Sequence, residues 1–478
     1  MNIVNQFHNA ANQFPTNIAI VYKGKATTYA ALQQLVLCRA NGLKQVGIAK
    51  GDNVMLMIPY SLELYVNILA LFHLGVRVVL VDAIKDKKGV LKAYQKADCK
   101  GVITLPIIKL LRFYFFAKPL WRTFISTPKA TALAQNACEQ TEGDSALITF
   151  TSGTTGNPKA ADRTHDFLNI QLSTLVDEMQ IKSSDVHITS LPVVLMCNLA
   201  VGASSIISPN PSKTVEWDFI KTHYSPNMVS ASPAHFTAFI KRLNIEIFNK
   251  VFIGGATILP HFVEEITRQI NPEYIHFAYG STEAEPIALV SAVDALLQNP
   301  NEKGICVGKP HPAIKLLIAS VQDGQIAEMD EGEIGEVLVA GPHVLNNYYK
   351  DEAAFKANKV IDGETIWHRT GDLGYVRKGK LYFYGRLKFA WFEGEELVSP
   401  LVYEKFLSHQ NPAAEGTCLH LNDRNVVFAA GIKVEDIATL NQQFAYPIHD
   451  VILLPKLPKD KRHLSRIDYE KLIRKYFG

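Results

Sequence analysis

The sequence predicts an α/β protein, with a large body of parallel α/β subdomains, a β-rich portion and a small α+β part at the C-terminal end. Three observations lead to this class. Apolar strands and helices alternate in the first 105 residues, the same alternation returns around residues 186–290, and short alternating strands with Gly-rich turns follow residue 300. Strands that alternate with helices indicate parallel sheets with right-handed crossovers.

The individual elements follow from their hydrophobic patterns. Residues 53–58 and 77–82 are predicted to be buried strands because they are continuous apolar runs. Between them, residues 61–74 place Leu62, Tyr65, Leu69 and Phe72 at helical spacing. A polar helix is predicted near residues 87–97, followed by a strand at 101–105. In the β-rich portion, residues 333–340 and 379–385 are predicted strands, and beyond Arg386 the chain ends in a basic, helical tail.

Composition limits the possible functions. The 478 residues contain 49 Lys and Arg against 46 Asp and Glu, a net charge of +3, which argues against a nucleic-acid partner because such proteins need concentrated positive charge. Six scattered cysteines form no CxxC pair, so neither disulfides nor a zinc site is expected. The N-terminus resembles no signal peptide and no run of about 18 apolar residues occurs, so we expect a cytoplasmic protein without membrane spans.

Residues 107–125 combine basic side chains with a run of aromatic ones. This composition is typical of a helix that lies on a membrane surface. A core helix with a basic rim, interrupted at Pro119, explains the same pattern. The sequence therefore leaves weak membrane-surface contact as one of two interpretations.

The strongest motif is an apolar strand that ends in a loop of hydroxyls, glycines and a lysine. The glycines would let backbone N–H groups approach an anion, and the hydroxyls and the lysine would contact phosphate oxygens. The spacing differs from a Walker A loop, since no Gly-Lys-Ser/Thr occurs. The loop residues are Thr151, Ser152, Gly153, Thr154, Thr155, Gly156 and Lys159.

This run resembles the phosphate loop of the adenylate-forming superfamily, which includes acyl-CoA synthetases, peptide-synthetase adenylation domains and luciferases. The resemblance extends over nearly the whole chain. It implies ATP and Mg²⁺ as cofactors, an N-terminal adenylation domain over residues 1–385, and a mobile C-terminal domain over residues 386–478 on a hinge. It also implies transfer of the acyl group to the thiol of CoA or phosphopantetheine, the latter on an acyl carrier protein.

Further motifs occur in the order that the resemblance requires. The segment Gly254-Gly255-Ala256 is similar to the one that lies against adenine in the family. In Tyr279-Gly280-Ser281-Thr282-Glu283, the resemblance implies that the tyrosine packs by adenine, the threonine contacts phosphate and the glutamate binds Mg²⁺. A single carboxylate together with phosphate oxygens and water suits that ion. Glu285 is expected to be a solvated charge instead.

The resemblance also covers the end of the β-rich portion. Asp372 matches the residue that accepts hydrogen bonds from both ribose hydroxyls, which one carboxylate can do. Arg386 matches the arginine at the hinge, near the ribose or phosphate. Lys388 lies close to the usual pivot, although an exposed loop lysine is an equal interpretation.

One departure concerns the catalytic lysine of the tail, whose position is occupied here by Arg466. Arginine keeps the charge but differs in shape and reach. Three outcomes are open. Arg466 performs the lysine's role, Lys459 or Lys461 replaces it, or the adenylation step is lost. We favour the first because the other motif residues remain.

Residues 191–207 occupy the acyl-pocket region of the family and are strongly apolar, which favours a fatty or otherwise apolar carboxylic acid as substrate. The segments around residues 279–288 and 457–472 also resemble the olefin-pathway β-lactone synthetases, which act on a β-hydroxy acid without a thiol acceptor. Three hypotheses remain at this point: an acid–thiol ligase, a β-lactone synthetase, and an inactive nucleotide-binding homologue with a regulatory or partner role.

Overall fold

The computed structural model describes the chain except for residues 82–86, 111–119, 121–123, 126–132, 135–136, 140–142, 152–158, 211–212, 243–246, 300–301, 411–413, 433–445, 461–465 and 478. The described chain forms two compact units. The first comprises residues 1–230, 282–285 and 342–357, and the second comprises residues 231–281, 286–341 and 358–478. The domain boundary at residues 385/386 stays a prediction.

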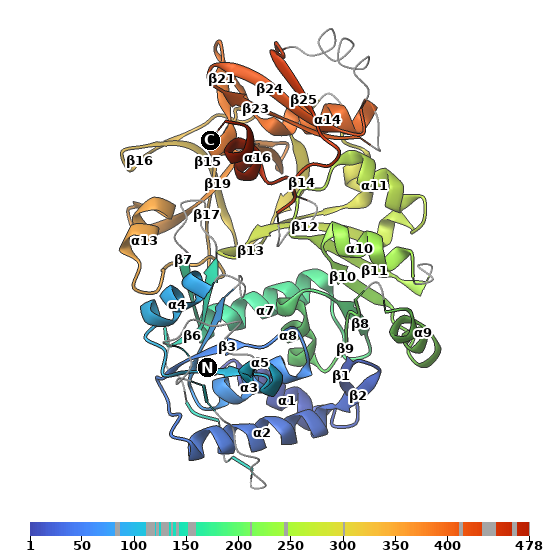
Figure 1. Ribbon diagram of the computed structural model, residues 1–478, viewed down its shortest axis with the longest axis vertical. Coiled ribbons are helices and arrows are strands. Elements are labelled where there is room, and N and C mark those ends of the chain that lie inside the picture. The colour runs from blue at the N-terminus through green and yellow to red at the C-terminus, as the bar shows by residue number, and fades with distance from the viewer. Residues whose placement is uncertain are drawn as a thin grey trace. The chain divides into compact units, whose positions relative to one another are not determined.

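The first predicted alternation forms a five-stranded sheet in the first unit, with the order β5-β3-β4-β6-β7. Strands β3, β4, β5 and β6 are parallel, as predicted, and β7 is antiparallel to β6. Helix α4 packs on this sheet through Val90 and Ala93 (Figure 1). The elements are β3 (Asn53–Met57), α3 (Leu62–His73), β4 (Arg77–Val81), α4 (Lys87–Lys96), β5 (Gly101–Thr104), α5 (Pro106–Leu110), β6 (Ser145–Thr151) and β7 (Lys159–Thr164).

Helix α3 is more deeply buried than its amphipathic pattern suggests. Every residue from Leu64 to His73 is buried, including the polar Asn67. Asn67 accepts a hydrogen bond from Arg39 at 2.7 Å, and Arg39 also pairs with Glu63 at 2.6 Å. The helix is thus covered on its polar side as well, because an arginine from α2 satisfies the buried amide.

The second parallel sheet of the first unit places β8 between β10 and β9, with β1 paired to β9 and β2 to β1. It contains the first part of the second predicted alternation. The elements are α1 (Val4–Gln13), β1 (Ile18–Tyr22), β2 (Lys25–Thr28), α2 (Tyr29–Gln45), α7 (His165–Met179), β8 (Val186–Thr189), α8 (Pro192–Val201), β9 (Ser204–Ile207), α9 (Thr214–His223) and β10 (Met228–Ala231).

The second unit begins with a parallel pair and continues as an antiparallel sheet. Strands β11 and β12 are parallel, and the antiparallel strands form the predicted β-rich portion. Its elements are α10 (Pro233–Ile240), β11 (Lys250–Gly254), α11 (Pro260–Thr267), β12 (Ile275–Ser281), β13 (Ala284–Ser291), α12 (Ala292–Leu296), β14 (Ile305–Pro310), β15 (Lys315–Gln322), β16 (Gln325–Glu328), β17 (Gly335–Ala340), β18 (Lys359–Asp362), β19 (Thr365–Arg377) and β20 (Lys380–Arg386). Helix α13 (Glu352–Asn358) belongs to the first unit up to residue 357.

The C-terminal part of the second unit is a small α+β assembly, which agrees with the predicted mixture of elements. A three-stranded sheet of β23, β24 and β25 packs with α14 and α16. The elements are the 3-10 helix η4 (Leu387–Phe389), β21 (Trp391–Glu393), β22 (Glu396–Val398), α14 (Pro400–Gln410), β23 (Glu415–Leu421), β24 (Arg424–Ala430), β25 (Asp450–Leu453) and α16 (Tyr469–Tyr476).

Glu404 of α14 anchors the tail to this assembly. Its Oε1 accepts hydrogen bonds from the Thr417 hydroxyl, at 2.8 Å, and from the Tyr469 hydroxyl at the start of α16. Desolvation raises the pKa of Glu404 to about 7, against the opposing effect of the two hydroxyls and of Lys459. A carboxyl group that is partly neutral near physiological pH therefore lies at the base of the tail.

Within the described residues, no helix is long and apolar enough to cross a membrane. Most of the 107–125 segment, whose contact with a membrane surface remains a prediction, lies outside those residues. Its described start, α5, exposes Ile107 and Leu110. All six cysteines are free thiols.

Gly308 provides a test of the antiparallel sheet. It adopts a φ of +99° at an irregularity in β14, and a Cβ built there lies 1.9 Å from the carbonyl oxygen of Leu289. We expect Gly308→Ala to lower the free energy of unfolding by more than about 2 kcal/mol. Gly363→Ala is the matched control, because Gly363 has a φ of +55° and open space around its Cβ position, so it should cost about 1 kcal/mol. Urea unfolding measures both, and equal costs would contradict the packing described.

Glu404 provides a test by pH. A carboxyl whose pKa is raised on folding stabilises the folded state below the unfolded pKa, and that contribution is lost as the pH rises through about 7. Glu404→Gln stays neutral and can still accept hydrogen bonds. We expect the variant to gain stability over the wild type between pH 5 and pH 8, by at most about 3 kcal/mol. Exposed Glu364→Gln should show no such trend in the same urea titrations. Parallel pH profiles for wild type and Glu404→Gln would contradict burial of this carboxyl.

Candidate active site

The predicted phosphate loop connects two paired strands of the first unit. Thr151 is the last residue of β6, Lys159 is the first residue of β7, and the two are cross-strand partners. Lys159 is half-buried where the loop rejoins the sheet. The residues between them, including Ser152, Gly153, Thr154, Thr155 and Gly156, lie outside the described part of the chain. The structure thus places both ends of the loop at one edge of a five-stranded sheet.

Thr282 is held directly beside β7. The guanidinium of Arg163, on β7, donates one hydrogen bond to the carbonyl oxygen of Thr282 at 2.9 Å and another to the hydroxyl of Thr149 at 2.9 Å. Arg163 therefore connects β6, β7 and the Thr282-Glu283 pair. Sequence reasoning missed this role, because nothing around Arg163 shows that a segment more than a hundred residues away packs against it.

Glu283 is held by a third segment, residues 344–349. The backbone N–H of Leu345 donates to the carbonyl oxygen of Glu283 at 2.7 Å, and the Tyr348 hydroxyl donates to its Oε1 at 3.2 Å. Tyr348 also forms an antiparallel bridge with Ala161, two residues after Lys159. The first unit therefore holds Glu283 beside β7, the strand that begins at Lys159.

Tyr348 is a site residue that the sequence did not reveal. Its side chain is only 2% exposed, and desolvation, followed by the nearby charge of Glu283, raises the pKa of its hydroxyl. It therefore remains a neutral donor and orients one oxygen of the carboxylate. No motif contains it, so only the tertiary contact identifies it.

The donor set around Glu283 fits Mg²⁺ better than a transition metal. No cluster of three or more His, Cys, Asp or Glu side chains occurs in the described ranges. A single oriented carboxylate leaves phosphate oxygens and water to complete an octahedral shell, which is the usual arrangement for Mg²⁺. Glu283 is thus the residue that could hold the predicted ion.

Glu285, which we expected to be a solvated charge, is half-buried. Desolvation raises the pKa of its carboxyl, and the positive charge of Arg163 opposes this rise. The carboxyl also acts on Cys197 of α8, because its negative charge contributes to the raised pKa of that thiol. The expectation was wrong because Glu285 lies in β13 and is covered by α7, as the hydrogen bond from Gln171 to the Glu285 carbonyl shows.

The second unit contains a separate group of predicted residues, centred on Asp372. The Tyr279 hydroxyl donates to Oδ2 of Asp372 at 2.7 Å. Arg386 Nε lies 3.0 Å from Oδ1, as an ion pair, but Oδ1 is buried and receives no hydrogen bond from any described residue. A buried carboxylate oxygen without a donor is a fitting acceptor for a ligand hydroxyl. Tyr279, Asp372 and Arg386 are therefore brought together, as predicted.

The glycine segment lies beside the strand that carries Tyr279. Gly254 ends β11, and a Cβ on it would lie 3.3 Å from the Cβ of Ala278, the residue before Tyr279. Gly255 follows with a φ of +83°, and Ala256 is half-buried. In the predicted motif, Gly280 is exposed and Ser281 half-buried. Gly254 thus packs closely against the residue before Tyr279, and Gly255 after it is exposed.

The residues after Arg386 are attached to the tail helix. Lys388 pairs with Glu470 of α16, and Phe389 packs edge-on against Tyr469 with ring centroids 4.9 Å apart. Lys388 is therefore more than an exposed loop lysine, since η4 and α16 form one local assembly. Its role as the pivot stays a prediction.

Arg466 lies at the end of a short ladder. Lys459 bridges Ile467, and the backbone N–H of Asp460 donates to the carbonyl oxygen of Arg466 at 2.9 Å. Lys459 Nζ pairs with Glu415 at 2.8 Å, which disfavours Lys459 as the replacement for the family lysine. Lys461 lies outside the described residues. Arg466 thus stays the best candidate of the three.

Comparisons with known proteins agree with this geometry. The AMP-binding enzyme family matches residues 7–349. The olefin β-lactone synthetase of Stenotrophomonas maltophilia is 27% identical over 80% of this chain and 79% of its own, and the 4-coumarate–CoA ligase 3 of Arabidopsis thaliana is 25% identical over 86% and 76%.

Solved structures show the same fold. The ATP-bound MatB of Rhodopseudomonas palustris superposes with a TM-score of 0.83 at 21% identity, covering 100% of this chain and 99% of that protein. The O-succinylbenzoate coenzyme A synthetase MenE of Bacillus subtilis, in complex with AMP, superposes with a TM-score of 0.80 at 21% identity, covering 95% of each chain. From the family match over residues 7–349 and the motifs in their places, this chain belongs to the AMP-binding enzyme family of adenylate-forming ligases.

Proposed function

We propose that this protein uses ATP and Mg²⁺ to activate an apolar carboxylic acid as an acyl-adenylate and then transfers the acyl group to a thiol. The observation that carries the proposal is the position of Glu283. Two segments distant in sequence hold it beside the strand that leaves the phosphate loop: Arg163 bonds the carbonyl of the preceding Thr282, and Leu345 and Tyr348 bond Glu283 itself. This arrangement suits binding of a metal–triphosphate.

The first step joins two anions. A carboxylate oxygen of the acid attacks the α-phosphorus of ATP, the bond to the β-phosphate oxygen breaks, and pyrophosphate leaves. No proton is transferred, because the nucleophile is already ionised. Mg²⁺ at Glu283 would offset the phosphate charge. Catalysis then consists of positioning and electrostatic stabilisation, which the loop N–H groups and Lys159 are suited to provide.

The Asp372 group would bind the nucleoside portion of ATP. Its buried Oδ1 lacks a hydrogen-bond donor among the described residues and can accept from a ribose hydroxyl. The Tyr279 ring and the glycines at 254–255 would pack by the adenine base. Ser281 and Thr282 are consecutive in the chain. The Asp372 group and the Glu283 group are therefore covalently joined within the motif of residues 279–283.

The proposed acceptor is the thiol of CoA or of phosphopantetheine on an acyl carrier protein. The thiol sulfur attacks the acyl carbonyl and AMP leaves, while the thiol proton is lost to solvent. The part from residue 386 to residue 478 is proposed to rotate between the two steps, as rigid-body domain motion allows. The contacts of Lys388 and Phe389 with α16 support movement of η4 and the tail as one piece.

The apolar nature of the acid is inferred from α8. Val194, Leu195, Cys197 and Leu199 of this helix are buried, and no charged residue belongs to it. A charged substituent on the substrate would lose hydration there without a partner on this helix. A fatty or aryl acid therefore fits better than an amino acid.

A second candidate is β-lactone formation from a β-hydroxy acid. The specific observation is Glu285, a half-buried carboxyl with a raised pKa whose charge reaches α8. In this reaction the β-hydroxyl oxygen would attack the acyl carbonyl of the adenylate, AMP would leave, and the hydroxyl proton would pass to a carboxylate such as Glu285. Two relatives that are named olefin β-lactone synthetase, each 27% identical to this chain, support this second candidate.

A pyrophosphate-release screen tests the proposal. The protein is incubated with ATP, Mg²⁺ and a panel of medium- and long-chain fatty, aryl and β-hydroxy acids, with and without CoA. We expect release with at least one acid, and a loss of about 10²- to 10³-fold for Glu283→Gln, which removes one charge from the metal site. Glu273→Gln, an exposed carboxylate on a surface turn, is the matched control and should keep full activity.

The acceptor arm of the screen separates the two candidates. Complete turnover that requires CoA or a carrier protein supports the ligase and excludes the β-lactone synthetase. Turnover of a β-hydroxy acid without any thiol supports the lactone instead. Silence with every acid, while Glu283→Gln and wild type bind ATP equally, would refute both.

Arg466 determines whether the adenylation step survives the departure from the family lysine. We expect Arg466→Ala to slow adenylation by about 10²-fold or more, because a positive charge at the reacting phosphate is lost, and Arg466→Lys to retain or increase the rate. Single-turnover formation of the adenylate measures this step by itself. If the wild type binds ATP without turnover and only Arg466→Lys is active, the chain is the inactive nucleotide-binding homologue, with a regulatory or partner role.

A further inference from the structure

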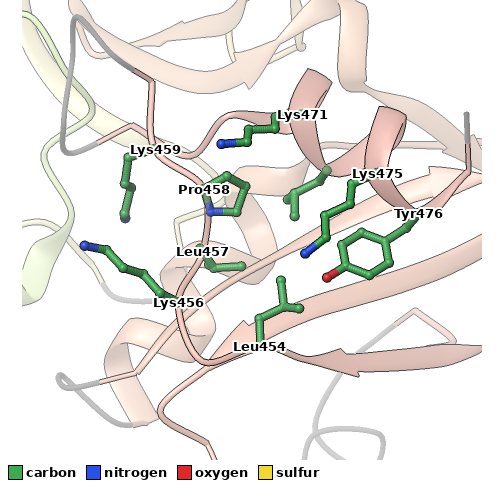
Figure 2. A pocket seen from close by; sticks show the side chains of 9 residues that line it. Leu454, Lys456, Leu457, Pro458, Lys459, Lys471, Lys475 and Tyr476 are labelled. Atoms are coloured by element: carbon green, nitrogen blue, oxygen red, sulfur yellow. The ribbon is translucent and has the colours of Figure 1, made fainter.

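The tail of the second unit encloses a cavity of about 520 Å³ that no step of the proposed reaction uses. One wall is the segment after β25, and the other is α16 (Figure 2). We call it the tail cavity. Its volume falls in the range of small-molecule sites in proteins, about 300–1,000 Å³. The lining residues are Leu454, Lys456, Leu457, Pro458, Lys459, Lys471, Leu472, Lys475 and Tyr476.

The floor of the tail cavity is apolar and firmly packed. Leu457 and Leu472 are each 1% exposed and belong to a core cluster with Phe428 of β24. Leu454 and the ring of Tyr476 pack against the same cluster and are partly buried. Because these side chains are fixed by the core beneath them, the floor is a preformed apolar surface.

The rim of the tail cavity is positively charged. Lys471 and Lys475 are four residues apart and thus share one face of α16, and Lys456 and Lys459 lie on the opposite wall (Figure 2). Lys459 is paired with Glu415. Of the described carboxylates, none forms a salt bridge with Lys456, Lys471 or Lys475, and Lys475 lies over the Tyr476 ring at 4.9 Å from its centroid.

This positive charge is concentrated rather than general. Residues 454–478 contain eight Lys or Arg and three Asp or Glu, which is a net charge of +5. The whole chain carries only +3, so the remaining residues carry −2. Several like charges around one small cavity repel one another, and an anion placed among them would relieve that repulsion.

We propose that the tail cavity binds one anionic amphiphile. A phosphate or carboxylate head lies among Lys456, Lys471 and Lys475, and an alkyl portion lies on Leu454 and the Tyr476 ring. Charge complementarity selects the head group, and the apolar floor selects the alkyl portion of the ligand. The concave shape and the volume of the cavity favour one such molecule over the flat face of an acidic protein.

The amphiphile can come from two sources, as a soluble molecule or as an acidic lipid at a membrane surface. Both present the same chemistry to the tail cavity. The cavity adjoins the Lys459–Ile467 ladder that carries Arg466. An occupied cavity would therefore lie against the ladder that positions the proposed catalytic arginine.

Binding of dodecyl phosphate, below its critical micelle concentration, tests the proposal by calorimetry on the full chain without ATP. We expect saturable binding with one site, weakened about fivefold by Lys471→Gln or Lys475→Gln and by more than about tenfold when both are changed. Arg474→Gln is the matched control, because Arg474 is an exposed cation on the same helix that does not line the cavity. Leu454→Ala should weaken dodecyl phosphate more than inorganic phosphate.

Further binding measurements distinguish a soluble amphiphile from an acidic lipid, and both of these from an acidic protein. Sedimentation with phosphatidylcholine vesicles, with and without phosphatidylglycerol, shows whether the lipid form binds, and loss of that binding in the double lysine variant supports an acidic lipid as the source. Binding that Arg474→Gln weakens as much as Lys471→Gln overturns the site. So does binding of polyglutamate without binding of dodecyl phosphate or acidic vesicles. Because ATP is absent, failure here leaves the pyrophosphate-release screen unaffected.

Discussion

The first group of site residues depends on the contacts that hold Glu283 beside β7. Arg163 holds the Thr282 carbonyl, and Leu345 and Tyr348 hold Glu283 itself, so two other parts of the chain fix this carboxylate. The Ala161–Tyr348 bridge makes this arrangement part of the backbone rather than of flexible side chains alone. A site built this way loses little entropy when its ligand binds.

In the second unit, we propose that a different group of residues recognises the neutral hydroxyls and the aromatic base of the nucleotide. Asp372 is buried between Tyr279 and Arg386, and its Oδ1 is oriented by an ion pair but receives no hydrogen bond from the described residues. A buried acceptor without a donor is unfavourable unless a ligand satisfies it. The residues proposed to bind charge and those proposed to bind hydroxyls thus belong to separate compact units, whose boundary in the sequence lies between Ser281 and Thr282.

The C-terminal tail combines anchoring with concentrated charge. Glu404 and the contacts of Lys388 and Phe389 hold α16 to the rest of the small assembly, so the ladder that ends in Arg466 has a fixed base. The same helix contributes two lysines to the tail cavity. A basic tail that looks in sequence like an ordinary solvated end is, in the fold, one wall of a cavity with an apolar floor.

The sequence by itself determined the fold class, the alternating and β-rich parts of the chain and the presence of the motifs, because hydrophobic periodicity and the glycine-and-hydroxyl loop are local properties of the chain. It could not identify Arg163 and Tyr348 as partners of Thr282 and Glu283, the burial of Glu285, or the tail cavity. Each of these depends on segments between about fifteen and two hundred residues apart that only the packed structure brings together. Burial also raises the pKa of the Glu285 and Glu404 carboxyl groups. The sequence could not show this, because desolvation depends on neighbours that no local pattern specifies.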